Sequence, residues 1–155
     1  MRVSYGSLAA LGLILAATSA QAVESKVTKT STQSVDAVWT KVGDFCGISQ
    51  WHPALAKCEL SADKKDRTLT LKGGGTIVEH LIRWSDKMHS YTYKIVSGPL
   101  PVTGYVSTLH VGKSGTGSKI TWTGHYSAAK GTSDADAKKT IDGVYQGGVD
   151  ALAGS

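Results

Sequence analysis

The order of the local sequence patterns is the feature that most constrains how this chain folds. A short helical pattern comes first, and Pro53 then interrupts it, because proline pushes the residue before it out of the α region. Strand-like segments follow, and one amphipathic helix closes the chain. This order predicts an α+β domain in which a curved antiparallel sheet grips the last helix around a pocket.

The short helix has recognisable ends. Ser34 is a typical N-cap, and Gly43 is suited to end the helix. The apolar face between them consists of Val35, Val38, Trp39 and Val42. The segment Phe45–Trp51 is predicted to add a further helical turn.

The long C-terminal helix is predicted to begin after Ser133, which forms a capping-box-like pair with Asp136. Its apolar stripe consists of Ile141, Val144, Tyr145, Gly148, Val149 and Leu152. The stripe is typical of a helix that faces a core. The glycines of this helix disfavour it intrinsically, so they indicate either close packing or space left for another group. They are Gly143, Gly147 and Gly148.

Seven segments carry strand patterns, which predicts a seven-stranded sheet. They are Glu24–Gln33, Ala54–Leu60, Arg67–Leu71, Thr76–Trp84, His89–Ser97, Val102–Val111 and Lys119–Tyr126. Turn-forming residues separate the later segments. These linkers are Gly73–Gly75, Ser85–Asp86, Gly98–Pro101 and Gly112–Gly117.

The first residues have the pattern of a secretory signal. Arg2 supplies the positive start, Leu8–Ala17 is an apolar stretch too short to span a bilayer, and Ala20-Gln21-Ala22 resembles a cleavage site. We therefore expect residues 1–22 to be removed and residues 23–155 to form one periplasmic or secreted domain without a membrane span. A retained anchor is the alternative, and it would need a longer apolar stretch.

Cys46 and Cys58 are the only cysteines of the sequence, and in an oxidising compartment they are predicted to form a disulfide. A redox role is disfavoured because the pair lacks Cys-x-x-Cys spacing. The formal net charge is +5, and the lysines are spread along the chain, which excludes a concentrated nucleic-acid-binding surface. Steering towards an acidic protein or an anionic ligand stays open.

Motifs for nucleophilic catalysis or nucleotide binding are absent from the sequence, so we expect no cofactor. A metal site is also not expected, because several histidines lack ligand spacing with one another or with the cysteines. These histidines are His80, His89, His110 and His125.

Several short motifs occur in an order that matches a known superfamily. They are Trp39-x-x-Val42-x-Asp44-Phe45, Trp51-His52-Pro53, Glu79-x-Leu81, Tyr93-x-Ile95, Gly98-Pro99-Leu100-Pro101 and Tyr105-x-x-x-Leu109. The chain resembles the START-like, or Bet v 1-like, helix-grip superfamily (SRPBCC), and within it the bacterial polyketide cyclase/dehydrase type. A closer resemblance is to the small exported accessory proteins of bacterial methanol dehydrogenase systems.

The superfamily resemblance implies a cavity for an apolar or amphipathic molecule between the sheet and the last helix. It also places Gly73–Gly75 and Gly98–Pro101 where plant receptors of the superfamily carry a gate loop and a latch loop. The accessory resemblance implies a periplasmic dehydrogenase or cytochrome as a protein partner.

Glu79 is the candidate acid or base, because the superfamily turns its strand face towards the cavity and burial would raise its pKa. A structural ion pair, with Arg83 on the same face as its partner, and an outward-facing side chain are the alternatives. Residues on the inward strand faces, at the Trp51-His52 junction, in the Gly98–Pro101 loop and on the last helix are predicted to bind the ligand with Glu79. These are Trp51, His52, Tyr93, Leu100, Pro101, Tyr105, Trp122, Tyr126 and Tyr145. The alternative is a filled core without a cavity.

Three functions remain open from the sequence. The first is a non-catalytic protein outside the cytoplasm that holds a hydrophobic or amphipathic small molecule, with Leu100 and Pro101 closing the mouth. The second is an accessory protein that binds an acidic partner through its surface. The third is a cyclase-like enzyme that uses Glu79 for acid–base chemistry.

Overall fold

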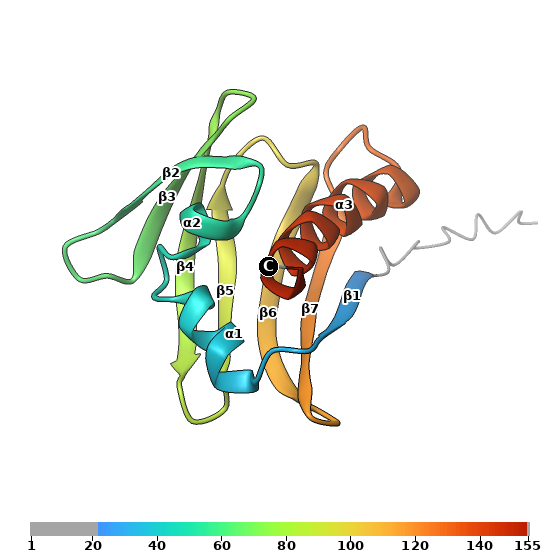
Figure 1. The fold of residues 1–155 in the computed structure, drawn as a ribbon. Coiled ribbons are helices and arrows are strands. Elements are labelled where there is room, and N and C mark those ends of the chain that lie inside the picture. Colours follow the sequence, from blue (N-terminus) through green and yellow to red (C-terminus); the bar gives the residue numbers. More distant parts are fainter. Residues whose placement is uncertain (1–21, 155) are drawn as a thin grey trace, which may run out of the picture.

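The computed structural model describes residues 22–154, and within them seven strands form one antiparallel sheet in the order β1-β7-β6-β5-β4-β3-β2. The strands are β1 (Val23–Ser31), β2 (Leu55–Leu60), β3 (Asp66–Leu71), β4 (Thr76–Ser85), β5 (Ser90–Ser97), β6 (Val102–Ser114) and β7 (Gly117–Ala128). The sheet curves, and the helices lie on one side of it (Figure 1). The predicted helix-grip fold is confirmed.

The helices begin and end as the capping residues predict. Helix α1 (Val35–Val42) starts after Ser34, whose hydroxyl accepts the backbone N–H of Ala37, and ends at Gly43 with φ of 71°. The predicted further turn is α2 (Ile48–Trp51). Helix α3 (Asp134–Ala153) starts after Ser133, which accepts the N–H of Asp136 at 3.1 Å.

The seven predicted strands are present, with ends shifted by a few residues: Ser85, predicted in a turn, ends β4, and Gln33, predicted in the first strand, lies beyond β1. His89 has φ of 44° and belongs to the turn before β5, because only a turn accommodates that conformation. Gly112, predicted as the start of the last turn, lies inside β6 opposite Lys119. The turn itself needs one residue with positive φ, which Gly115 supplies at 58°, so the two strands pair almost to their ends.

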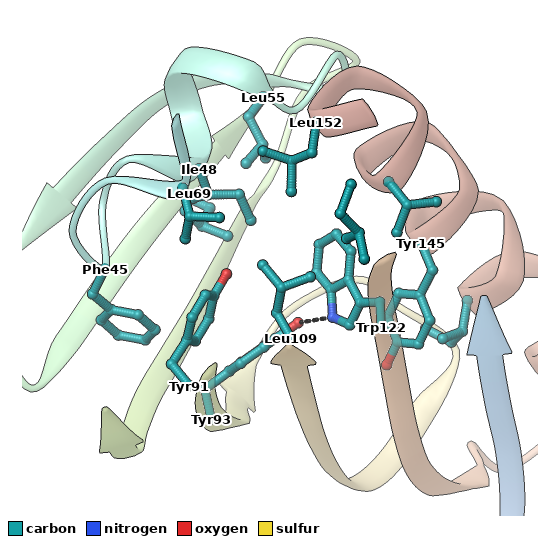
Figure 2. Packing of buried hydrophobic residues seen from close by; sticks show 14 of the residues in the cluster. Phe45, Ile48, Leu55, Leu69, Tyr91, Tyr93, Leu109, Trp122, Tyr145 and Leu152 are labelled. Carbon is teal, nitrogen blue, oxygen red and sulfur yellow. Dashed lines mark hydrogen bonds between the residues drawn. The ribbon is translucent and has the colours of Figure 1, made fainter. Parts of the chain in front are cut away.

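Helix α3 packs closely against the sheet at one glycine. A Cβ atom on Gly148 would lie 2.3 Å from Cζ3 of Trp122 and 3.0 Å from Cδ2 of His52, so no larger residue fits without displacing them. Figure 2 shows Trp122 and the phenol of Tyr145 stacked beneath this helix. A Cβ on the exposed Gly143 would meet no atom within 4 Å, so packing does not require glycine there.

The predicted disulfide is present. Cys46 and Cys58 join the segment between α1 and α2 to β2, with Cα atoms 5.5 Å apart. Phe45, directly beside the bridge, packs with Tyr91 and Tyr93 in the core (Figure 2). The bridge therefore fixes a segment that contributes to the interior of the domain.

The predicted signal peptide lies outside the described residues, apart from Ala22 at its end, and the domain boundary at residue 23 stays a prediction. Across residues 22–154, none of the helices combines the length and apolar character needed to cross a bilayer.

Candidate functional site

A partly open cavity of about 60 Å³ lies between the sheet and α3. Because a cavity needs roughly 10–15 Å³ of this volume to hold one water, there is room for a few waters or for a ligand of few heavy atoms. Its wall is mostly apolar and draws on strands β2 to β7, on α2 and on α3. It consists of Ile48, His52, Ala54, Leu55, Leu69, Leu71, Ile77, Glu79, Tyr93, Leu100, Tyr105, Trp122 and Val144.

The structure brings most of the predicted site residues to this wall. Those that line the cavity are His52, Glu79, Tyr93, Leu100, Tyr105 and Trp122. Those that do not are Trp51, Pro101, Tyr126 and Tyr145. Sequence patterns fixed which strand face points inwards, but not which inward side chains border an unfilled space.

The four predicted residues away from the wall have other contacts. Trp51 packs edge-on against Trp122 and donates its indole N–H to a backbone carbonyl of α1. The carbonyl of Pro101 accepts a backbone hydrogen bond from the segment after β7. Tyr126 bonds at 2.5 Å to a serine hydroxyl of β1. Tyr145 stacks on Trp122 and lies behind the wall.

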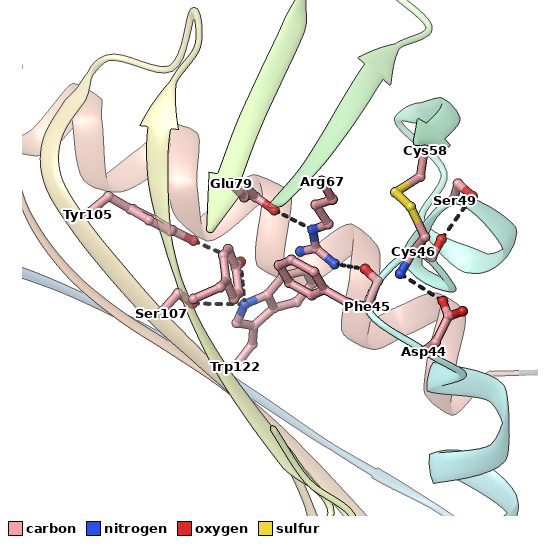
Figure 3. Close-up of polar contacts among 11 residues, drawn as sticks. Asp44, Phe45, Cys46, Ser49, Cys58, Arg67, Glu79, Tyr105, Ser107 and Trp122 are labelled. Atoms are coloured by element: carbon pink, nitrogen blue, oxygen red, sulfur yellow. Dashed lines mark hydrogen bonds and ion pairs between the residues drawn. A yellow bond between two sulfur atoms is a disulfide. The ribbon is translucent and has the colours of Figure 1, made fainter. Parts of the chain in front are cut away.

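Glu79 forms a buried ion pair with Arg67, its directly paired neighbour on β3. The Arg67 Nε donates to Oε2 of Glu79 at 2.6 Å, and Nη1 donates to the carbonyl of Phe45 (Figure 3). Arg83, the partner expected from strand parity, is exposed, because a bulge between Leu81 and Arg83 shifts the alternation. The prediction of Arg83 as the partner is therefore wrong.

Aromatic rings surround the Arg67 guanidinium. Its central carbon lies 4.0 Å from the ring centroid of Phe45, 5.0 Å from that of Tyr93 and 5.7 Å from that of Tyr91. These contacts are favourable cation–π geometry. The remaining nitrogen, Nη2, is buried and makes no hydrogen bond of good geometry with residues 22–154, although Tyr91 lies close enough to interact electrostatically.

Burial raises the pKa of Glu79, and the positive charge of Arg67 opposes that rise. Burial by itself lowers the pKa of Arg67, but the attraction of Glu79 outweighs it and keeps the pKa raised. Arg67 therefore stays charged.

Arg67 was missed from the sequence, although a signal existed. It has the same strand parity as the apolar Leu69 and Leu71, which places a charged side chain on the inward face. Folding the hairpin over Gly73–Gly75 puts it opposite Glu79. Opposite charges on paired inward positions predict a buried pair.

Four hydroxyl groups, which we call the hydroxyl network, form hydrogen bonds that all run in one direction, from the cavity wall to the residues behind it. Ser107 donates to the carbonyl of Thr123 at 2.7 Å and accepts from Tyr145 at 2.9 Å. The single proton of Tyr145 is thereby used, so Tyr105 must donate across the 2.6 Å contact to Tyr145. By the same reasoning Tyr93 donates to Tyr105 across 3.2 Å.

Trp122 supplies the remaining donor of this network. Its indole N–H is shared between Ser107 at 3.0 Å and Tyr93 at 3.2 Å. Both lone pairs and the proton of Ser107 are therefore engaged. Burial raises the pKa of Tyr93 and Tyr105 well above the ordinary phenol value, so both stay protonated.

Both ring nitrogens of His52 bond to the backbone. Nδ1 accepts the N–H of Ala54 at 3.2 Å, so it carries no proton, and Nε2 lies 3.0 Å from the carbonyl of Val144, to which it donates. Burial lowers the pKa of His52, which favours this neutral tautomer. The ring therefore joins the start of β2 to α3 and presents only carbon atoms to the cavity.

Residues 22–154 match the family described as polyketide cyclase / dehydrase and lipid transport. The chain belongs to this family. The predicted membership of the START-like superfamily is thereby confirmed. Among curated proteins, no sequence gives a significant match.

Solved structures similar to this polyketide cyclase/dehydrase family member share its whole fold. The protein XoxI from Bacillus cereus is 30% identical, with a TM-score of 0.81 over 84% of this chain and 93% of that chain. An uncharacterised protein from Bacillus thuringiensis is 30% identical, with a TM-score of 0.80 over 84% and 96% of the two chains. A START superfamily protein from Mycobacterium smegmatis, at 14% identity and a TM-score of 0.70 over 85% and 95%, has the same fold.

The wall of this family member offers little for acid–base chemistry. Glu79 is held in an ion pair, the His52 nitrogens are bonded to the backbone, and the phenols of Tyr93 and Tyr105 resist ionisation. In the part of the chain that the structure describes, no three metal-ligating side chains come together. The arrangement is suited to holding a small molecule.

Proposed function

We propose that this protein binds a small, mostly apolar molecule in the cavity between the sheet and α3, and releases it chemically unchanged. The observation that carries the proposal is the apolar cavity of about 60 Å³ with a single carboxylate, Glu79, in its wall. A few polar groups in an apolar enclosure are the usual composition of a small-molecule site. The ion pair of Glu79, the backbone bonds of both His52 nitrogens and the raised pKa of the Tyr93 and Tyr105 phenols support binding over turnover.

The cavity size also argues against large ligands. Pockets for drug-sized molecules measure roughly 300–1,000 Å³. A fused-ring polyketide or a lipid would need the wall to move outwards, and Leu100 is the wall residue best placed for that. It lines both the cavity and a surface hollow beside the β5–β6 connection, so it separates one from the other together with Tyr105.

Xenon tests the cavity directly, because it enters apolar cavities without needing a hydrogen bond. We expect xenon pressure to shift the NMR methyl signals of Leu69 and Ile77 saturably, and Leu69→Phe to abolish the shift of the Ile77 methyls by filling the space. Ile82→Phe, at a position that is 51% exposed, is the matched control and leaves the shifts unchanged. Absence of saturable shifts in the unmodified protein would overturn the proposal.

Native mass spectrometry of the protein from its own host then tests whether the cavity is used. We expect a small-molecule adduct on the unmodified protein and on Ile82→Phe, but not on Leu69→Phe. An adduct retained by Leu69→Phe would place the ligand elsewhere and contradict the proposal.

We propose further that the protein is exported. The predicted signal sequence and the disulfide between Cys46 and Cys58 support this. Mass spectrometry of the intact protein from a periplasmic fraction tests it, because removal of the signal predicts a chain that starts at Val23.

An accessory role in a periplasmic dehydrogenase system is a second candidate, with which the similarity to XoxI is compatible. Removal of the predicted signal takes away Arg2 and lowers the net charge from +5 to +4, which still favours an acidic dehydrogenase or cytochrome as partner. This candidate predicts salt-sensitive protein binding that Leu69→Phe does not alter. A cyclase-like activity would instead require turnover that is lost in Glu79→Gln, with a bell-shaped pH dependence.

A further inference from the structure

The hydrogen-bond donors in the cavity wall are already used. The proton of Tyr93 goes to Tyr105, that of Tyr105 passes to Tyr145 behind the wall, and the indole N–H of Trp122 is shared within the hydroxyl network. The N–H of His52 donates to a carbonyl of α3. Among residues 22–154, the side chains of the wall therefore have no uncommitted polar hydrogen to offer a ligand.

An uncommitted acceptor does lie in the wall. Oε2 of Glu79 accepts from Arg67, but Oε1 receives no hydrogen bond from residues 22–154, and the residue is 5% exposed. Oε1 is not fully buried, and as a carboxylate oxygen in a mostly apolar wall it needs a donor, which a ligand in the cavity can supply. Arg67 is not a competing donor for the ligand, because it does not line the cavity and its unbonded Nη2 is buried.

The ion pair also sets the charge of a suitable ligand. Arg67 already neutralises Glu79, so a cation would enter an apolar space without a negative charge of its own to pair with, and a carboxylate would face Glu79 directly. A neutral donor meets neither penalty. The volume of about 60 Å³ limits it to a few heavy atoms.

We propose that the cavity selects small neutral molecules that donate a hydrogen bond, such as short-chain alcohols, and that Oε1 of Glu79 accepts this bond. The inference rests on the proposed function, since it names the chemistry of the ligand for the same cavity. Molecules of equal size that only accept hydrogen bonds leave Oε1 unpaired, or must take the proton of Tyr93 from Tyr105.

Ethanol and acetonitrile test this selection, because they have the same number of heavy atoms and acetonitrile lacks a polar hydrogen. Their dissociation constants follow from titrations of the methyl signals of Leu69 and Ile77 and of the indole signal of Trp122. A hydrogen bond to a charged acceptor predicts that ethanol binds about tenfold or more tightly than acetonitrile. Xenon, measured on the same sample, reports whether the cavity admits any small guest.

Removing the ion pair as a unit identifies the acceptor without leaving a buried charge. In Arg67→Met/Glu79→Met the preference for ethanol should fall to near unity while xenon still binds. The matched control removes another ion pair, between β1 and α3 outside the cavity wall, as Lys29→Met/Asp150→Met, and keeps the preference.

The outcomes separate the two proposals. Equal affinities for ethanol and acetonitrile, with xenon bound, would overturn the selection of a donor and leave the proposed function standing. A preference for ethanol that survives in Arg67→Met/Glu79→Met would overturn the role of Glu79. Failure of xenon as well as both organic probes would overturn the selection together with the proposed function.

Discussion

Replacing Arg67 by methionine removes the positive half of the buried pair and leaves Glu79 without a partner. The structure loses a charge-assisted hydrogen bond of 2.6 Å, a bond to the carbonyl of Phe45 and a cation–π contact of 4.0 Å. Methionine recovers some of the packing against the rings. Breaking one side of a buried ion pair costs roughly 3–5 kcal/mol of unfolding free energy.

This cost converts into a measurable shift of the melting temperature. With an unfolding entropy of about 2.1 cal/mol/K per residue and about 130 ordered residues, Arg67→Met should lower Tm by roughly 11–18 °C. Thermal unfolding followed by circular dichroism, with urea unfolding as an independent measure, gives both quantities.

The pH dependence distinguishes an unpaired charge from lost packing. Without Arg67, which opposes the rise, the folded-state pKa of Glu79 rises further above its ordinary 4.5. A carboxyl whose pKa is raised on folding contributes stability that is fully present at pH values below its pKa in the unfolded chain. This contribution is lost as the pH rises through its pKa in the folded protein. The loss of unfolding free energy in Arg67→Met, relative to the unmodified protein, should therefore be largest at neutral pH and shrink towards pH 4.5.

Two further variants complete the test. Glu79→Met should be destabilised at every pH, because a guanidinium cannot lose its proton. Arg67→Met/Glu79→Met should recover most of the stability, because an apolar replacement of a buried pair is often neutral. A double variant as unstable as Arg67→Met, with a deficit independent of pH, would refute the reasoning and leave packing as the cause.

Three other perturbations have defined outcomes. Gly148→Ala should lower the unfolding free energy by about 1–3 kcal/mol because the added methyl overpacks the core. Gly143→Ala should raise it by up to about 1 kcal/mol because alanine favours the helix. Urea unfolding measures both changes. Cys46→Ala/Cys58→Ala should lower the unfolding free energy by about 3 kcal/mol. A reducing agent should lower the unfolding free energy of the unmodified protein but leave that of the double variant unchanged. Because burial lowers the folded-state pKa of His52, an NMR titration of its ring should have a midpoint below 6.5. Stability should also fall as the pH drops below 6.5, where the unfolded chain takes up the proton first.

The sequence predicted the features that depend on local chemistry. Ser34 and Gly43 mark the ends of α1 because caps act within a few residues. Arg67 was missed because its role appears only when the β3–β4 register is known, and Arg83 was misplaced because a bulge leaves no clear trace in the residue types. Register and bulges depend on pairing across the sheet.

The site was predictable to a similar extent. Strand alternation identified Tyr93 and Tyr105 as inward residues, and both line the cavity. Alternation applies to strands, so it does not reveal that Tyr145 on α3 lies behind the wall and bonds to Ser107. It also does not reveal that both nitrogens of His52 bond to the backbone. Those facts depend on contacts between α3 and the sheet, which join residues far apart in the sequence.

Because the hydrogen bonds of the hydroxyl network all run in one direction, its tyrosines differ in how readily each can be replaced by phenylalanine. The network ends on a peptide carbonyl, so a proton entering at Tyr93 has no exit and conduction is not its role. If the Tyr93 hydroxyl is lost, every other phenol O–H keeps its acceptor. Loss of the Tyr105 hydroxyl instead leaves the O–H of Tyr93 without an acceptor, and loss of the Tyr145 hydroxyl does the same to Tyr105. Phenylalanine should therefore appear among relatives most readily at Tyr93, which lines the cavity.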